Sequence, residues 1–475
     1  MKGLRIMRKT PDFVKYAAGI VPDERQLKWQ ELGFNALVSY GMNTYTNSEW
    51  GNGNEDPELF APTVLDCRQW AKLCKLSGIK GLILTVKHQD GFCLWPSAYT
   101  DHCVSASKWK QGRGDVVAEC AAACREFGIK FGVYLSIWDR HEETYGTSAY
   151  NDFFKNQLRE LLTDYGDIFC VWLDSTGCGD PVRDHDMEGW VKLIRELQPN
   201  AVIAGCGCDV RWCGNDLGVC RRSEWSVVPY YYSDLEAARL ADQADVSKPP
   251  KKINSAALEP GNRKAIKACN RLIWYPAEVN MPLRKGWFYH PNDDYNVKPL
   301  SKIAEVYYRS VGANASLLLG IAPNPEGKIH EKDVETLLSV GAQLEIDFNE
   351  DLAADSVVTD SCRLDDKHSG QKALSDYPGE YWHSGDDPDG AELVLDLGDE
   401  YDIDKILLAE HIATGQQIEE FSIYVKLGGK WKKIANETVV GHCRICRFKE
   451  VRAQYFKIVI EKARCFATLE RLEAY

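Results

Sequence analysis

The sequence has little positive charge and no long apolar run. Its 475 residues carry 57 lysine and arginine side chains against 70 aspartates and glutamates, a formal net charge of −13. This deficit of cations argues against nucleic acid and against an anionic membrane surface as partners. No apolar segment approaches the ~18 residues that a membrane span needs, and none near the N-terminus is long enough for a signal peptide. We therefore expect a cytoplasmic protein with no membrane partner.

Metal and dinucleotide motifs are also missing. The 17 cysteines are an odd number in a long chain without a visible export signal, which favours reduced thiols over a disulfide framework. Cys206 and Cys208 form a C-x-C pair, but no second pair stands at zinc-site spacing. No G-x-G-x-x-G follows the first apolar run, which disfavours a dinucleotide-binding domain. We expect neither a metal nor a cofactor.

Apolar runs alternate with helical patterns over the first two thirds of the chain. The runs, rich in Val, Ile, Leu and Phe, are 34–41, 79–88, 129–138, 168–174, 201–206 and 314–321. Runs that are apolar on both sides are typical of parallel strands covered by helices. The intervening segment 114–128 has helical spacing, with Asp115 as its predicted N-cap and Gly128 as its end. Six strands, with room for two more, predict an α/β fold, a (β/α)₈-like barrel over residues 1–345, rather than an open doubly wound sheet.

The pattern changes after residue 350. Short stretches of alternating polar and apolar residues, separated by Gly and Asp turns, occupy 391–411, 421–441 and 455–462. Such stretches predict antiparallel strands. They favour an all-β sandwich over residues 350–475, joined to the barrel through the acidic stretch 346–356.

A β/α barrel builds its active site at the C-terminal ends of its strands, so the polar residues that end the apolar runs are the candidates. They are Ser39, Lys87, His88, Gln89, Asp90, Tyr134, Trp138, Asp139, His141, Asp174, Asp209, Arg211 and Glu224. Asp174 ends a strand-like run just before Ser-Thr-Gly, which leaves a turn residue and a catalyst both open. The 14 tryptophans can stack on sugar rings, although any one of them can simply pack in the core. Carboxylates and aromatics without a metal cluster or a phosphate loop favour glycoside hydrolysis.

Several motifs, in order from about residue 28 to 345, resemble family 29 of the glycoside hydrolases, the α-L-fucosidases. They include LTVKHQDGFCLWPSAYTDHCV (84–104), KFGVYLSIWDRH (130–141), VWLD (171–174), SEWSVVP (223–229) and PAEVNMPLRKGWFYHP (276–291). The last two are most similar to the subgroup that acts on α-1,3/1,4-linked fucose of Lewis-type glycans. The C-terminal part resembles a discoidin-like, galactose-binding sandwich. Its candidate glycan-binding side chains are Trp382 and His383, the alternative being a purely structural domain.

The resemblance implies a retaining mechanism with a fucosylated oligosaccharide as substrate. Asp174 would be the nucleophile and Glu224 the general acid/base, with carboxyls roughly 5–5.5 Å apart. His88, Tyr134, Trp172, Arg211 and Trp287 would line the fucose pocket, and Glu49 and Trp50 would meet the next sugar. A buried ion pair with Arg221 or Arg222 is the alternative for Glu224. Glu278 and Asp139 are the reserve carboxylates, and Asp90 is interpreted as a turn residue.

Two positions depart from the family pattern. Ser39 stands where the family has a histidine that binds fucose, and Gln89 stands where it has a second histidine. Each lost contact is worth about 1–3 kcal/mol, enough to retune an enzyme but far less than the loss of a nucleophile. Two alternatives to fucosidase activity therefore remain open. One is the hydrolysis of a larger sugar such as L-galactose, and the other is glycan binding without turnover.

Overall fold

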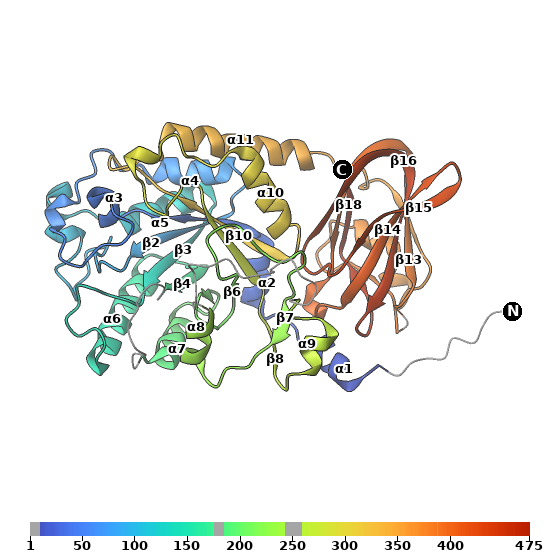
Figure 1. Cartoon of the computed structure of the whole chain (residues 1–475), viewed down its shortest axis with the longest axis horizontal. Helices are drawn as coiled ribbons and strands as arrows, with labels where there is room; N and C mark the ends of the chain where they lie inside the picture. The colour runs from blue at the N-terminus through green and yellow to red at the C-terminus, as the bar shows by residue number, and fades with distance from the viewer. Residues whose placement is uncertain (1–9, 175–184, 243–258, 387) are drawn as a thin grey trace.

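The chain folds into a parallel β/α barrel followed by an antiparallel β-sandwich. The computed structural model describes residues 10–174, 185–242, 259–386 and 388–475. In Figure 1 the two units lie side by side along the long axis of the molecule, with the barrel on the left. The fold class predicted from the apolar runs is confirmed.

Eight parallel strands form the barrel sheet in the order β5-β4-β3-β2-β1-β10-β9-β6. They are β1 (Phe34–Val38), β2 (Gly81–Lys87), β3 (Lys130–Ser136), β4 (Cys170–Asp174), β5 (Val202–Ala204), β6 (Arg211–Trp212), β9 (Ala277–Pro282) and β10 (Ala315–Ile321). A parallel bridge between Ala204 and Val210 joins the β5 edge to the β6 edge. Six of these strands fall within the predicted runs, and β6 and β9 take the remaining two places.

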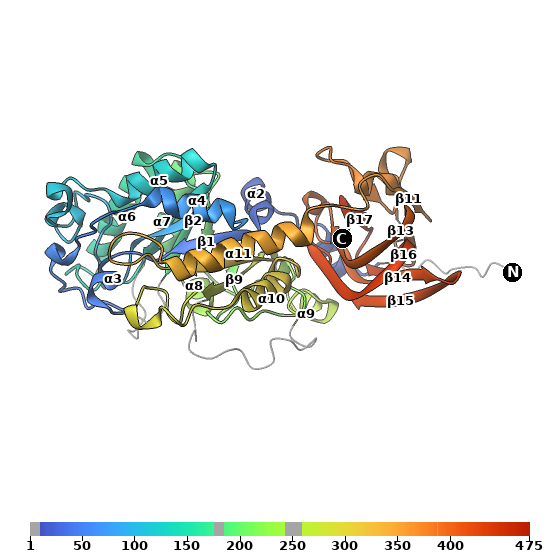
Figure 2. The ribbon, with the colours of Figure 1, turned by 90° about the horizontal axis from the view of Figure 1, so that it is seen from above.

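Helices cover the outside of the barrel. They are α2 (Glu24–Leu32), α3 (Met42–Thr46), α4 (Cys67–Leu76), α5 (Val116–Phe127), α6 (Ser148–Asp164), α7 (Met187–Leu197), α8 (Leu235–Asp242), α10 (Leu300–Ser310) and α11 (Glu331–Phe348). The Asp115 side chain accepts the amide of Ala118 at 2.8 Å, and Gly128 ends α5 at φ 72°, as the sequence predicts. Figure 2 shows α11 crossing the barrel toward the sandwich. Within the described residues, every helix is too short or too polar to cross a bilayer.

The sandwich is built on two long, bent strands. Its strands are β11 (Val357–Asp360), β12 (Trp382–His383), β13 (Ala391–Ala409), β14 (Ile418–Leu427), β15 (Lys430–Glu437), β16 (Arg444–Ala463), β17 (Thr468–Leu469) and β18 (Arg471–Ala474). Register shifts along the antiparallel pair β13–β16 mark bulges in these strands. Trp382 is wholly buried in the sandwich core, where its indole nitrogen donates to Cys362 O at 3.1 Å. It therefore has no face to offer a glycan, contrary to the expectation for this residue.

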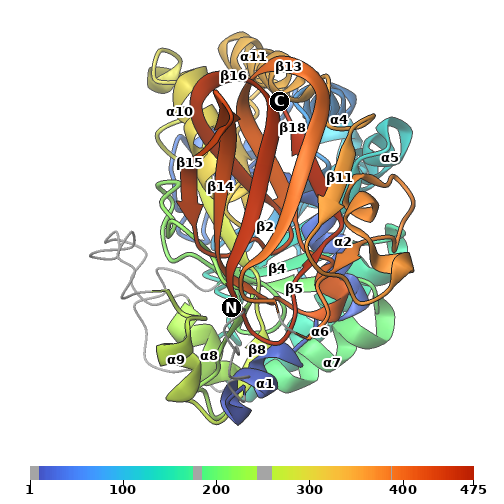
Figure 3. The same ribbon diagram turned by 90° about the vertical axis from the view of Figure 1, so that its right-hand side faces the viewer.

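The barrel and the sandwich share a hydrogen-bonded interface, and Figure 3 shows the sandwich covering one side of the barrel. Its centre is residues 222–227 of the barrel, which we call the docking segment. Arg444 of β16 donates to Arg222 O at 3.0 Å and to Ser223 Oγ at 3.2 Å. Gln416 accepts the amides of Ser226 and Val227 at 2.9 and 3.3 Å. The docking segment leads into β7 (Val227–Pro229), which pairs with β8 (Leu272–Trp274) outside the barrel, close to α1 (Asp12–Ala18) and α9 (Arg263–Lys267).

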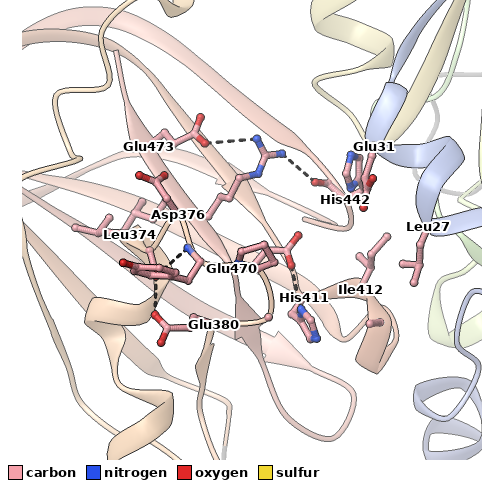
Figure 4. A pocket seen from close by; sticks show the side chains of 18 of the residues that line it. Leu27, Glu31, Leu374, Asp376, Glu380, His411, Ile412, His442, Glu470 and Glu473 are labelled. Carbon is pink, nitrogen blue, oxygen red and sulfur yellow. Dashed lines mark hydrogen bonds and ion pairs between the residues drawn. The ribbon is translucent and has the colours of Figure 1, made fainter. Parts of the chain in front are cut away.

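A cavity of about 440 Å³ lies at the junction of the two units (Figure 4). Leu27 and Glu31 of α2 form its barrel side. The remaining wall is of mixed character and includes Glu470, whose carboxylate lies 3.0 Å from His411 Nδ1. None of the described residues that line it belongs to a barrel strand. The cavity is therefore remote from the strand ends where a barrel places its catalytic groups.

Candidate functional site

A second cavity, of about 110 Å³, opens among the C-terminal ends of the barrel strands. Its wall combines aromatic rings with a few polar groups, a composition typical of a pocket for a small polar ligand. It is lined by Leu37, Ser39, Trp50, Thr85, His88, Tyr134, Trp172, Asp174, Trp212, Asp216, Asn280, Trp287 and Phe288. Two carboxylates, Asp174 and Asp216, share this small space.

Asp174 is the last residue of β4 and points into the cavity. The Tyr134 hydroxyl on the neighbouring strand β3 donates to Asp174 Oδ2, and burial together with this carboxylate holds the pKa of Tyr134 well above its usual range. The tyrosine therefore stays a hydrogen-bond donor and stabilises the ionised carboxylate. Its ring stacks on Trp172 with centroids 5.4 Å apart, which fixes the hydroxyl in place. The Ser-Thr-Gly stretch that follows Asp174 lies outside the described residues.

Asp216 enters the cavity from a tight loop after β6. The Asn215 side chain closes this loop by accepting the amides of Leu217 and Val219 at 3.0 and 3.2 Å. Gly218, at φ 68°, anchors the loop to β9 through its amide, which donates to Asn280 O at 3.0 Å. Burial raises the pKa of Asp216 to about 6, opposed by a hydrogen bond from Trp287 and assisted by the negative charge of Asp174. Asp216 therefore retains its proton at a higher pH than an exposed aspartate does.

His88 presents a ring proton to the cavity. The Asn43 amide nitrogen lies 3.0 Å from His88 Nδ1, and an amide nitrogen can only donate, so Nδ1 accepts and the ring proton is on Nε2. Burial, with a smaller contribution from Arg140, lowers the pKa of His88 to about 3. The imidazole is therefore neutral at ordinary pH, with a fixed tautomer that suits a sugar hydroxyl.

Glu49 lies behind the cavity wall. Its carboxylate accepts the Trp287 amide at 2.5 Å and lies 3.0 Å from His290 Nε2. These contacts hold the segment that presents the Trp287 indole to Asp216. Its neighbour Trp50 stands at the mouth of the cavity and is 62% exposed, so one face of its ring is open to a ligand.

Glu224, for which the resemblance implies the acid/base role, does not line this cavity. Its side chain is wholly buried, with Arg211 Nη2 at 2.8 Å and Arg221 Nη1 at 3.4 Å. Burial acts to raise the pKa of Glu224, but these two cations outweigh it and hold the pKa below its usual range, so the group is a carboxylate without a proton to donate. Arg211 is also absent from the pocket, because side chains alternate along β6 and Trp212 takes the inward direction. The ion pair with Arg221, left open by the sequence, is present.

The remaining polar candidates serve the barrel itself. Gln89 is buried and does not line the cavity. Asp139 pairs with Lys87 at 2.7 Å in the barrel interior, and Glu278 accepts the Trp172 indole at 2.9 Å. Asp90 Oδ1 accepts the Phe92 amide at 2.7 Å, the turn contact expected of it. Among the described residues there is no group of three or more side chains that would hold a metal ion.

Comparisons with known proteins bear on the identity of this site. Residues 21–348 match the family model described as alpha-L-fucosidase. The chain belongs to the α-L-fucosidase family. It is 36% identical over 464 residues to alpha-L-fucosidase 1 of Arabidopsis thaliana, which covers 96% of this chain and 87% of the plant protein. Family 29, to which these proteins belong, is a family of retaining glycoside hydrolases.

Solved structures of the α-L-fucosidase family have the same two-unit architecture. A glycoside hydrolase 29 family member from an unknown rumen bacterium superposes with a TM-score of 0.77 at 36% identity, covering 96% of this chain and 77% of the other. A Ruminococcus gnavus GH29 fucosidase, solved in complex with fucose, superposes with a TM-score of 0.84 at 27% identity, covering 96% and 95%. Residues 354–471 match the F5/8 type C domain model, the discoidin-like domain that the sequence predicts.

Asp216 lines the cavity but was not predicted from the sequence. It follows a strand of two residues, which is too short to be recognised from hydrophobic periodicity, and two further acidic residues, Asp209 and Glu224, lie in the same segment 209–224. The sequence did contain one indication of this loop. Gly214, Asn215 and Asp216 are residue types that favour a turn, and they follow shortly after Arg211 and Trp212, in a region where the barrel still lacked a predicted strand.

Proposed function

We propose that this protein is a retaining α-L-fucosidase in which Asp174 is the nucleophile and Asp216 the general acid/base. The observation that carries the proposal is that one small cavity holds these two carboxyls in different electrostatic surroundings. Asp174 receives a hydroxyl donor, whereas burial and a negative neighbour keep a proton on Asp216. A retaining glycosidase needs such a division between an ionised carboxylate and a protonated acid.

In the first step Asp174 attacks the anomeric carbon while Asp216 gives its proton to the departing glycosidic oxygen. This leaves fucose joined to Asp174 through an ester and the aglycone as a free alcohol. In the second step Asp216, now a carboxylate, takes a proton from water, and the resulting nucleophile displaces Asp174 from the same carbon. Two inversions give fucose with retained configuration and return both carboxyls to their starting states.

For the substrate we infer a terminal α-1,3/1,4-linked fucose on a Lewis-type glycan. Support comes from the SEWSVVP and GWFYHP motifs, which resemble that subgroup, and from Trp50, whose exposed ring at the cavity mouth suits a second sugar. The Ruminococcus gnavus relative solved with fucose supports the sugar itself. Ser39 and Thr85 give one side of the pocket small side chains, which favours L-galactose as the second candidate.

Substrate preference is tested by release of monosaccharide from an aryl α-L-fucoside, an aryl α-L-galactoside and a Lewis trisaccharide. We expect the trisaccharide to be cleaved with the highest kcat/KM, and Trp50→Ala to reduce that value about tenfold while leaving the aryl fucoside within about twofold. Faster hydrolysis of the galactoside than of the fucoside would show that L-galactose, and not fucose, is the preferred sugar. Binding of the trisaccharide without release of any sugar would show that turnover has been lost.

The pH profile of kcat/KM on the Lewis trisaccharide, whose leaving group needs a proton, reports on Asp216. Because the proton on Asp216 is needed in the first step, the rate should fall as the pH rises through about 6, approaching tenfold for each further unit. Asp216→Asn removes the titrating group, so the residual activity of this variant should lack the high-pH fall. A wild-type rate that stays flat to pH 8 would exclude Asp216 as the acid.

A further inference from the structure

Trp212 and Asn280 form one side of the catalytic cavity. Trp212 lies on β6 and Asn280 on the adjacent parallel strand β9, where Trp212 pairs in register with Glu278. Asn280 is two residues beyond Glu278, so it points to the same inner face, one step nearer to the cavity mouth. Both residues line the cavity, and they are only 5% and 3% exposed.

Each of these residues has a buried polar atom that the described protein leaves unsatisfied. Trp212 Nε1, a donor, and Asn280 Oδ1, an acceptor, are almost wholly buried and have no hydrogen-bond partner within the described part of the chain. Two other polar groups of the cavity wall do have partners, since the Trp172 indole donates to Glu278 and the Tyr134 hydroxyl donates to Asp174. Burying a donor and an acceptor without partners costs free energy, so such a pair in a cavity wall points to a ligand.

The orientation of the Asn280 amide follows from its neighbour. Glu278 is wholly buried, and hydrogen bonds from Trp172 and from the Asn280 side chain partly offset the effect of burial, which raises the pKa of Glu278 to about 7. A carboxylate accepts hydrogen bonds, so the amide nitrogen of Asn280 faces Glu278 and its oxygen is turned away from it. Glu278 is thus a positioning residue, because it fixes the direction of the Asn280 amide oxygen.

We propose that Trp212 Nε1 and Asn280 Oδ1 bind ring hydroxyls of the sugar held by Asp174, and so determine which hydroxyl pattern the enzyme accepts. This inference rests on the proposed function of the site. A sugar hydroxyl can accept from the indole N–H and can donate to the amide oxygen, and a single hydroxyl can do both. A sugar that lacks the matching hydroxyl would bury both atoms unpaired, which is the physical basis of strong discrimination.

The test pairs two variants with substrates that lack one hydroxyl each. Trp212→Phe keeps an aromatic ring without the N–H, and Asn280→Leu keeps the side-chain size without the acceptor. We expect each variant to lose about 10- to 100-fold in kcat/KM on the parent aryl α-L-fucoside. On one of its monodeoxy analogues the wild type should show a similar loss, and the corresponding variant should lose no more than about twofold further.

The pattern across the analogues decides the outcome. Coupling of each variant to one deoxy position supports the proposal, and coupling of both to the same position assigns a single bridging hydroxyl. An equal further loss on every analogue would overturn it, because a merely structural role reduces activity without regard to the hydroxyl. Trp431→Phe, a tryptophan-to-phenylalanine change on the sandwich, is the matched control and should leave kcat/KM unchanged. Thermal unfolding of each variant identifies any loss of fold.

Failure of the proposed function is separable from failure of this inference. If the wild type hydrolyses none of these fucosides, the proposed function falls. Titration calorimetry of the wild type with L-fucose and with its monodeoxy forms then tests the hydroxyl contacts directly. The inference is supported if the wild type binds one deoxy form more weakly than L-fucose and Trp212→Phe or Asn280→Leu binds the two equally. Equal binding of all forms by the wild type overturns the inference.

Discussion

Replacing Asp174 with asparagine is expected to lower kcat on an aryl α-L-fucoside by about a millionfold, as the loss of a catalytic nucleophile does. Asparagine has the same shape but a much weaker nucleophilic atom, so no ester to the sugar forms. The Tyr134 hydroxyl can still donate to the amide oxygen, so the fold should be preserved. The measurement is single-turnover release of the aryl alcohol from wild type and variant at equal enzyme concentration.

Tyr134→Phe is the matched control for this change. It removes the hydroxyl that stabilises the Asp174 carboxylate and leaves the carboxylate itself in place. A loss of about 10- to 100-fold is expected, far smaller than the loss in Asp174→Asn. If Asp174→Asn retained more than about a hundredth of the wild-type kcat, another group would have to be the nucleophile.

The second large effect is expected for Asp216→Asn, which should lose about 10²–10⁴-fold in kcat/KM on a Lewis trisaccharide. The loss should be much smaller in the first step with an aryl fucoside whose leaving group needs no proton. Water still has no base in the second step, so the fucosyl ester on Asp174 should accumulate. Azide needs no base either, and it should restore turnover by forming fucosyl azide. Chemical rescue with azide is therefore the measurement.

Glu224→Gln distinguishes Asp216 from the acid/base that the resemblance implies. The two cations that face Glu224, Arg211 and Arg221, would be left without their carboxylate, a change that costs about 3–5 kcal/mol of stability in a buried pair. We expect a lower Tm with kcat at room temperature within about tenfold of wild type. A variant of unchanged Tm that azide rescues would return the acid/base role to Glu224.

The position of Glu224 also explains what the sandwich does for the barrel. Asn314 donates to Glu224 O at 2.8 Å and accepts the His442 amide at 2.8 Å, so one side chain links the docking segment to the sandwich. Asp216 precedes this segment by only a few residues. The sandwich therefore braces the part of the chain that carries the proposed acid, and this structural role needs no glycan.

Much of the fold follows from local patterns in the sequence. Six barrel strands were predictable because strands buried on both faces must be apolar throughout, a requirement visible in a single run such as 79–88. The start of α5 was predictable because an N-cap aspartate and a C-terminal glycine act within one turn of the helix. Asp174 was a candidate pocket residue because it ends a strand-like run and barrels place their sites at strand ends, but the local pattern also allowed a turn residue.

Only the tertiary structure decided which later carboxylate meets Asp174. Asp216 and Glu224 lie eight residues apart, and both follow the short strand β6. Their directions depend on contacts with distant parts of the chain: Trp287 holds Asp216, whereas Glu224 is fixed by Arg211, Arg221 and the sandwich. The sequence by itself determined the barrel and the sandwich, and it placed Asp174 among the strand-end candidates. Which second carboxylate lines the cavity could be learned only from the folded chain, because the burial and the electrostatic surroundings of a side chain depend on residues that lie far apart in the sequence.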